Sequence, residues 1–124
     1  MNVVDSCAWL EYFADGPNAS FFASAVEDVE RLIVPTVCIY EVFKKVFAER
    51  GEDAALQAVA LMRQGTVVDF DFALALHAAT ISREQRIPFA DSIVYATARS
   101  RSAVVWTQDA HFENLEAVRY RAKK

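Results

Sequence analysis

Two aspartates stand just after short apolar runs near the two ends of the chain. Asp5 follows Val3 and Val4, and Asp109 follows the run that ends at Thr107. If both runs are parallel strands, their carboxyl ends share one edge of a sheet and bring the two carboxylates toward one crevice. Carboxylate oxygens are the ligands that hard divalent cations such as Mg2+ prefer. The alternative is that each aspartate only caps the helix that follows, since Asp is among the best N-cap residues.

Two further acids stand out by their surroundings. Glu41 is the one charged residue within VCIYEVF, residues 37–43, and a carboxylate among apolar residues is unfavourable without a compensating partner. Its alternative role is an exposed ion pair with Lys44 or Lys45 on the same helix. Asp91 follows a proline and opens a later helix, so N-capping is its alternative role. Taken singly, these acids do not establish a site.

The elements that must position these acids alternate between strands and helices. Short apolar strands are expected at 3–5, 32–35, 66–70, 103–107 and 117–120. Helices are expected at 6–14, 20–31, 37–50, 52–64, 71–86 and 90–100. This alternation indicates a parallel sheet covered on both faces, because a crossover between parallel neighbours needs a helix. The predicted fold class is therefore α/β, although periodicity alone does not give the strand order.

Length and composition favour one compact domain. The chain has 124 residues, of which 54% are hydrophobic, and we expect a single domain over residues 1–124. No apolar stretch reaches the roughly 18 residues of a membrane helix, and no secretory signal opens the sequence. We therefore expect a cytoplasmic protein with no membrane partner. In a reducing compartment Cys7 and Cys38 are expected to be small buried residues and not a disulfide.

The charge balance is compatible with a metal site. The sequence has 13 Lys and Arg against 17 Asp and Glu, a net charge of −4, which argues against coating of nucleic acid by bulk electrostatics. If four acids face a cation, the remaining acids balance the 13 basic residues. No competing zinc site is expected, because His77 and His111 are far apart and lack suitably spaced cysteines. His111 is expected to be an ordinary surface residue, and the alternative is a contact with a phosphate, because it flanks Asp109.

In combination, these motifs resemble those of the PIN-domain nucleases. They are Asp5-Ser6 after the first strand, Glu41 in an apolar helix, Asp91 at the start of a late helix, and Thr107-x-Asp109-x-x-Phe112 after another strand. In size the chain is similar to the VapC-like toxins of type II toxin-antitoxin pairs. The resemblance implies an α/β/α sandwich with a central parallel sheet in the order 3-2-1-4-5. It also implies Mg2+ or Mn2+ dependence and cleavage of single-stranded RNA to a 5'-phosphate and a 3'-hydroxyl.

The same resemblance assigns roles to individual residues. It implies a catalytic and metal-binding quartet supported by two hydroxyls, namely Asp5, Glu41, Asp91 and Asp109 with Ser6 and Thr107. Four closely spaced carboxylates repel one another and raise one another's pKa values, and a bound cation offsets that repulsion. We expect the three aspartates in the metal shell, Glu41 at a second ion or at the attacking water, and the hydroxyls orienting the carboxylates.

The first helix and the expected helix hairpin carry more apolar side chains than one buried stripe per helix needs. They are Trp9, Tyr12, Phe13, Val42, Phe43, Val46, Phe47, Leu56, Val59 and Met62. A groove beside the acidic site suits an amphipathic helix from another chain. For a VapC-like toxin that chain is the cognate antitoxin, and the other partner is a single-stranded or structured RNA substrate. The alternative is that these residues complete the core or a homodimer interface. We also expect the protein to form a homodimer.

Other classes of function remain as alternatives. A catalytically degenerate PIN-like domain, acting as an RNA- or protein-binding module, keeps the fold without the reaction. A phospho-acceptor receiver domain also places acids at strand ends, but it needs adjacent acids in its first loop, where Ser6 and Cys7 follow Asp5. A haloacid-dehalogenase-like phosphatase is disfavoured because residues 5–7 contain no Asp-x-Asp. Metal-dependent hydrolysis of an RNA oligomer separates an enzyme from a binding module.

Overall fold

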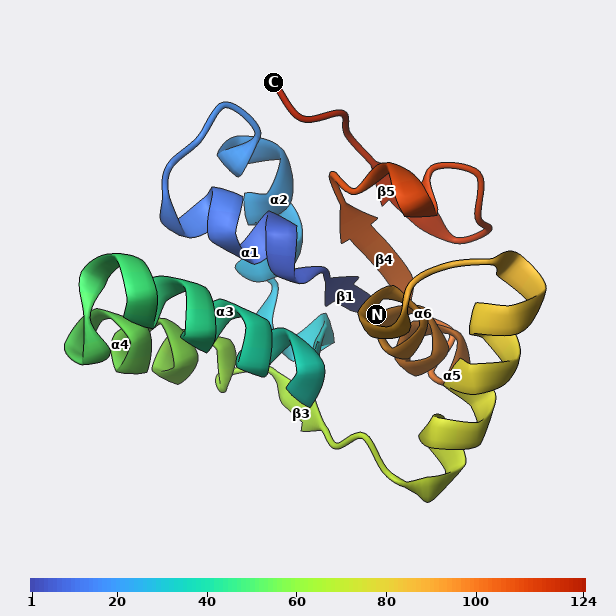
Figure 1. The fold of residues 1–124 in the computed structure, drawn as a ribbon. Coiled ribbons are helices and arrows are strands. Elements are labelled where there is room, and N and C mark those ends of the chain that lie inside the picture. Colours follow the sequence, from blue (N-terminus) through green and yellow to red (C-terminus); the bar gives the residue numbers. More distant parts are fainter.

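Five parallel strands form the central sheet of the computed structural model, which describes all 124 residues. The strands are β1 (Asn2–Val4), β2 (Leu32–Pro35), β3 (Thr66–Val68), β4 (Val104–Thr107) and β5 (Val118–Tyr120). Their order is β3-β2-β1-β4-β5 (Figure 1). Val3 of β1 pairs with Ile33 on one side and with Val105 on the other, so β1 is the central strand. The α/β class and the strand order implied by the resemblance are confirmed.

Six α-helices connect and cover these strands. They are α1 (Ser6–Phe13), α2 (Ala19–Val26), α3 (Thr36–Arg50), α4 (Glu52–Met62), α5 (Phe72–Gln85) and α6 (Phe89–Ser100). The helix expected over 20–31 was wrong in its extent, because α2 ends at Val26 and only a 3-10 turn, η1 (Val29–Arg31), continues the segment. Glu27 and Asp28 follow directly after α2, where negative charge opposes the helix dipole.

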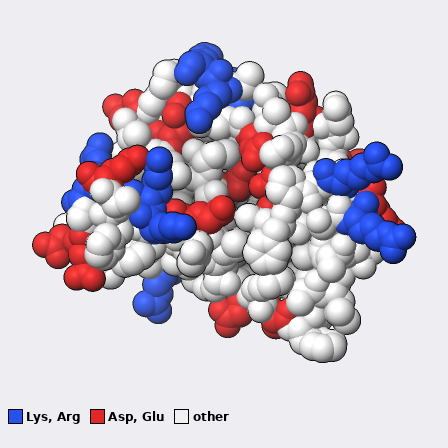
Figure 2. All heavy atoms as spheres, in the orientation of Figure 1, with Lys and Arg blue, Asp and Glu red and all other residues white.

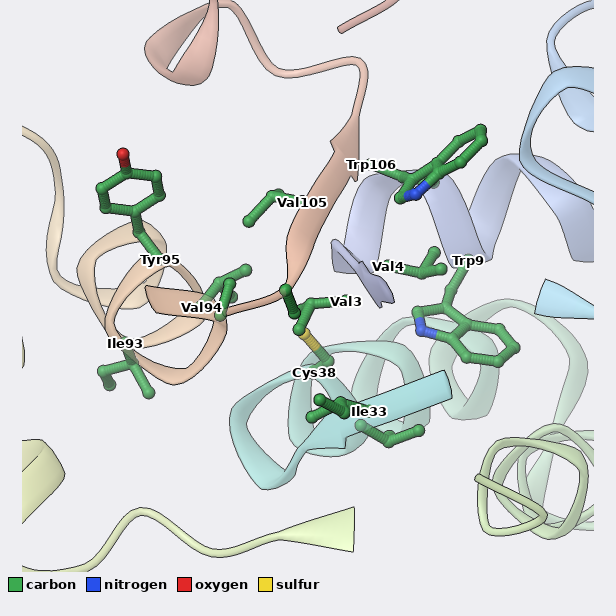
Figure 3. Packing of buried hydrophobic residues seen from close by; sticks show 14 of the residues in the cluster. Val3, Val4, Trp9, Ile33, Cys38, Ile93, Val94, Tyr95, Val105 and Trp106 are labelled. Carbon is green, nitrogen blue, oxygen red and sulfur yellow. The ribbon is translucent and has the colours of Figure 1, made fainter. Parts of the chain in front are cut away.

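Successive residues of the central strands face opposite helical layers. Val105 of β4 points toward Val94 of α6, whereas Val4 of β1 and Trp106 of β4 lie on the side of Trp9 in α1 (Figure 3). α6 contacts β1, β2 and β4, and α1 and α2 contact β4 and β1 respectively. The apolar residues of both layers form one core cluster of 27 buried residues. Burial on both faces explains why the strands read as apolar runs without alternation.

The predicted hairpin of α3 and α4 is present. Gly51 joins the two helices with a φ of 88°, a backbone conformation that is strained for residues with a Cβ atom. α3, which carries Glu41, packs closely against α4 and also contacts α1, α6 and β2. No helix of the protein has both the length and the hydrophobicity required to cross a membrane.

Candidate active site

The Asp5 carboxylate lies at the carboxyl end of β1 and is almost fully buried, with 3% of its surface exposed. It caps α1, since Oδ1 accepts the Ser6 backbone N–H at 2.9 Å. The other oxygen, Oδ2, accepts the Thr107 hydroxyl at 2.8 Å and lies 3.3 Å from the Cys7 thiol. Asp5 is therefore both a helix cap and a carboxylate fixed by donors from β4 and α1.

Thr107 connects the carboxylates that follow β1 and β4. Its hydroxyl donates to Asp5 and accepts the backbone N–H of Asp109 at 2.9 Å. Asp109 in turn accepts the backbone N–H of His111 at 2.9 Å through Oδ1 and caps the short turn η2 (Ala110–Phe112). The capping role considered for Asp109 is thus present, and it orients the carboxylate at the edge of the sheet.

Glu41 projects from α3 toward the start of α1. Its Oε1 accepts the Ser6 hydroxyl at 2.9 Å. The alternative ion pair with a neighbouring lysine is wrong, because Lys45 instead pairs with Glu49 at 3.1 Å and the Lys44 ammonium lies 5.8 Å from the Tyr40 ring centroid. Ser6 and Thr107, the two predicted supporting hydroxyls, therefore each hold one carboxylate of the predicted quartet.

Asp91 occupies the first turn of α6 but does not cap that helix. Pro88 is at the N-cap position, and the Asp91 carboxylate bonds to a side chain from another element. Its Oδ2 lies 2.9 Å from Nδ1 of His111, and the same nitrogen lies 3.1 Å from Oδ1 of Asp109. The N-capping alternative for Asp91 is wrong, and the carboxylates of α6 and η2 share one imidazole.

The electrostatics couple these acids to one another. The pKa of Asp5 is raised to about 6, chiefly by burial and also by the Asp91 carboxylate, against the hydrogen bonds from Thr107, Cys7 and the Ser6 N–H, which lower it. The pKa of Asp91 is also raised to about 6, chiefly by burial and then by the carboxylates of Asp109 and Glu41, against the opposing effect of His111. Each member of the predicted quartet is therefore within electrostatic reach of at least one other member.

No lysine or arginine forms an ion pair with any of the four acids. His111 is the one cationic side chain within salt-bridge distance of them, at Asp91 and Asp109, and those acids raise its pKa. Figure 2 shows the acidic side chains gathered near the middle of the visible face, with Lys and Arg set around them. Carboxylates are hard oxygen donors, and a divalent cation would offset the repulsion among these four, which no lysine or arginine compensates. One carboxylate oxygen each of Asp91 and Asp109 and a ring nitrogen of His111 lie within 4.8 Å of one another, as candidate ligand atoms.

Two residues of this site were not expected from the sequence. Cys38 is buried as predicted, but Cys7 is only partly buried, and its thiol contacts Asp5 and lies 3.4 Å from the Thr107 hydroxyl. His111 is exposed as expected, yet its ring lies between two acids of the quartet. The sequence does contain a signal for each, because Cys7 is in the first turn of the helix that Asp5 caps and His111 is in the turn that Asp109 caps.

A pocket of about 660 Å³ lies beside the acids, between α1, α3 and α4. Its apolar lining includes Leu10, Phe13, Val46 and Leu61, and Cys7 extends it to the acidic site. The groove was predicted on the correct helices, but the prediction of the residues that line it was partly wrong. Three of the residues expected to line it, Trp9, Val42 and Met62, are fully buried in the core, and Phe43 and Phe47 pack on each other outside the pocket.

Comparison with known proteins gives fold relatives at low sequence identity. A toxin-antitoxin complex chain from Klebsiella pneumoniae is 13% identical with a TM-score of 0.82, and the alignment covers 96% of each chain. VapC20 of Mycobacterium tuberculosis, described as a sarcin-ricin loop cleaving toxin, is 16% identical with a TM-score of 0.77, over 95% of this chain and 97% of that chain. A chain of DNA-bound VapBC from Salmonella typhimurium is 17% identical with a TM-score of 0.74, over 98% and 96%.

These structures establish only a shared fold, because their sequence identities are too low to show a shared activity. No curated protein sequence matches the chain significantly. The sequence does match the PIN domain family over residues 3–118, which spans all four acids of the site. By this match, with the strand order and the four acids at the carboxyl edge of the sheet, the chain belongs to the PIN domain family.

Proposed function

We propose that the protein is a Mg2+- or Mn2+-dependent endoribonuclease, the toxin of a toxin-antitoxin pair, which hydrolyses phosphodiester bonds of single-stranded RNA. The observation that carries this proposal is the convergence of four carboxylates from four separate elements with no lysine or arginine paired to them. An arrangement that only stabilised the fold would gain from a basic partner, because buried carboxylates without one are unfavourable.

In this proposal Asp5, Asp91 and Asp109 hold the cation, and Glu41 binds a second ion or orients the attacking water. A bound divalent cation in such a site polarises the scissile phosphate and lowers the pKa of a coordinated water. The chain contributes orientation: the Thr107 hydroxyl and the Ser6 N–H fix both oxygens of Asp5. The Ser6 hydroxyl fixes Glu41. Burial of Asp5 excludes bulk water from that side of the site.

An RNA substrate is supported by the charges around the acids and by the relatives. Lys45, Arg50 and Lys123 line the pocket that extends to Cys7, so cationic groups that can contact phosphates surround an acidic centre. Among the fold relatives, the Mycobacterium tuberculosis protein is described as cleaving the sarcin-ricin loop. A catalytically degenerate binding module is disfavoured here because all four acids of the predicted quartet are present and held by hydrogen bonds.

The direct test is cleavage of a labelled single-stranded RNA oligomer by purified protein. Cleavage is expected with Mn2+ or Mg2+, is expected to stop with EDTA, and is expected to resume when excess cation is restored. Cleavage that persists at full rate in EDTA contradicts a metal-dependent mechanism. RNA binding without cleavage under any cation favours the degenerate binding module.

We further propose that the antitoxin occupies the pocket between α1, α3 and α4. The apolar residues Leu10, Phe13 and Leu61 line the pocket, and such a lining suits the apolar face of an amphipathic helix. Because the pocket continues to Cys7, a basic side chain beyond that helix can reach the acidic site. The relative from Klebsiella pneumoniae is described as a toxin-antitoxin complex, and that from Salmonella typhimurium as DNA-bound VapBC.

The test is co-expression with the small open reading frame adjacent to the gene. Leu61→Asp places a charge in the pocket, whereas Leu76→Asp places the same charge on α5, away from the pocket; both leucines are partly exposed, at 38% and 59%. Co-purification is expected to be lost in Leu61→Asp and retained in Leu76→Asp, with both variants folded by circular dichroism. Retention in both variants contradicts this docking site.

A further inference from the structure

The imidazole of His111 lies at a point where two carboxylate oxygens converge. Its Nδ1 is 2.9 Å from Oδ2 of Asp91 and 3.1 Å from Oδ1 of Asp109. The backbone supports this placement, because the His111 N–H donates to the same Oδ1 of Asp109 at 2.9 Å. The side chain is otherwise open, with 57% of its surface exposed.

A single ring proton does not satisfy this geometry. Nδ1 carries at most one hydrogen, which makes one well-directed bond, and the structure has that hydrogen bond to Asp91. The Asp109 oxygen, only 3.1 Å from the nitrogen, has no hydrogen bond from the ring. A cation near the centre of the three atoms would be attracted to both carboxylates, and it would bind the Nδ1 lone pair after displacing the Nδ1 proton, with the remaining ring proton on Nε2.

The separations match those of ligands around one ion. Two ligand atoms at right angles, each about 2.1 Å from an octahedral cation, lie about 3.0 Å apart. The two nitrogen-oxygen distances, 2.9 and 3.1 Å, bracket that value. All three candidate ligand atoms lie within 4.8 Å of one another, so small side-chain adjustments suffice to bring them to one ion.

We propose that His111 is a direct nitrogen ligand of the cation held by Asp91 and Asp109, and that it makes the site select Mn2+ over Mg2+. This proposal rests on the proposed metal-dependent function and adds a ligand to it. Mg2+ is a hard ion that binds oxygen almost exclusively, whereas first-row transition metals accept imidazole readily. An all-carboxylate site gives no such preference, so the histidine determines which cation is bound.

The experiment measures Mn2+ and Mg2+ binding to the protein alone, prepared without a polyhistidine tag. His111→Asn removes the imidazole but keeps the backbone N–H that Asp109 accepts. His77→Asn is the matched control, because His77 is the only other histidine and is an exposed residue of α5. Titration calorimetry gives both affinities, and pulsed electron paramagnetic resonance detects 14N coupling between bound Mn2+ and a nitrogen ligand.

Wild type and His77→Asn are expected to bind Mn2+ with 14N coupling. His111→Asn is expected to lose the coupling and to bind Mn2+ about tenfold or more weakly, with Mg2+ affinity changed by less than about threefold. Unchanged Mn2+ affinity, or bound Mn2+ without 14N coupling in wild type, overturns the ligand assignment. Tighter Mn2+ binding in His111→Asn also overturns it, because the imidazole would then be a competitor of the ion.

These outcomes separate the assignment from the proposed function. Wild-type protein that binds Mn2+ without nitrogen coupling but cleaves RNA retains the function and loses the ligand. Protein that binds Mn2+ through His111 but cleaves no RNA retains the ligand and loses the function. Wild-type protein that binds neither cation at millimolar concentration overturns both. Circular dichroism of His111→Asn confirms that any loss of binding is not a loss of fold.

Discussion

Replacing Asp5 by Asn is expected to stabilise the metal-free protein while abolishing its activity. Asp5 is nearly fully buried and its pKa is raised from 3.8 to about 6, first by burial and then by the nearby Asp91 carboxylate. A shift of about 2 pKa units corresponds to roughly 3 kcal/mol between the two protonation states. Asn carries no charge and is as good an N-cap as Asp, so it avoids this unfavourable ionisation and keeps the start of α1.

The sign of the pH dependence follows from the direction of the shift. Because the folded pKa of Asp5 is higher than the unfolded value, ionisation of this group favours unfolding. The penalty is fully present above the folded pKa of about 6 and disappears as the pH falls toward the unfolded value of 3.8. The advantage of Asp5→Asn should therefore be largest at pH 7.5 and fall to roughly half near pH 5.

The assay is thermal and urea unfolding of both proteins in EDTA at pH 7.5 and pH 5. For a chain of 124 residues, about 3 kcal/mol corresponds to a rise in melting temperature of roughly 10 °C. Added Mn2+ should reduce the difference in stability between the two proteins, because the ion binds and stabilises folded wild type but not folded Asp5→Asn. Asp69→Asn, at an exposed position after β3, is the control and should change stability by less than about 0.5 kcal/mol.

A fall in stability for Asp5→Asn at pH 7.5 in EDTA would refute this reasoning. It would mean that the ionised carboxylate is a net stabilising cap and that its hydrogen bonds from Thr107 and Ser6 outweigh burial and repulsion. A gain in stability that does not decrease between pH 7.5 and pH 5 would show that the gain arises from packing and not from the charge.

Further predictions concern the supporting hydroxyls and the oligomeric state. Ser6→Ala and Thr107→Ala each remove one hydrogen bond to a carboxylate of the quartet and should reduce RNA cleavage about 10–100-fold without abolishing it; loss as complete as that of an acid would make either hydroxyl a direct ligand. The predicted homodimer is tested by light scattering on Phe72→Lys, since Phe72 of α5 is the most exposed of the large apolar side chains, with 81% of its surface exposed. A shift to monomer is expected, and an unchanged dimer would exclude this face.

The elements and the four acids could be predicted from the sequence because their signals are local. Val3 and Val4 before Asp5, and the apolar run before Asp109, identify strand ends without knowledge of the fold. Glu41 could be selected because a carboxylate among apolar neighbours requires a partner. The strand order has no local signal, because it depends on which distant strands pair with one another. Its prediction came from the family resemblance.

The contacts between side chains could not be predicted in this way. The ring of His111 contacts Asp91, which is 20 residues away along the chain. The Ser6 hydroxyl donates to Glu41 of α3 and not to a residue of its own helix. Such contacts depend on rotamers and on how α3 and α6 pack against α1 and β4. The excess apolar residues of α1, α3 and α4 likewise do not reveal from sequence which of them line the pocket and which, like Met62, enter the core.

The most direct test of the central claim is the rate of Mn2+-dependent RNA cleavage by Asp91→Asn compared with wild type. Asp91 touches only the site, through His111, and caps no helix, so the substitution should leave the fold intact by circular dichroism. We predict that cleavage falls to the level seen in EDTA, as it should for Asp5→Asn, Glu41→Gln and Asp109→Asn. Full activity in a folded Asp91→Asn protein would contradict the assignment of the four carboxylates to one catalytic metal site.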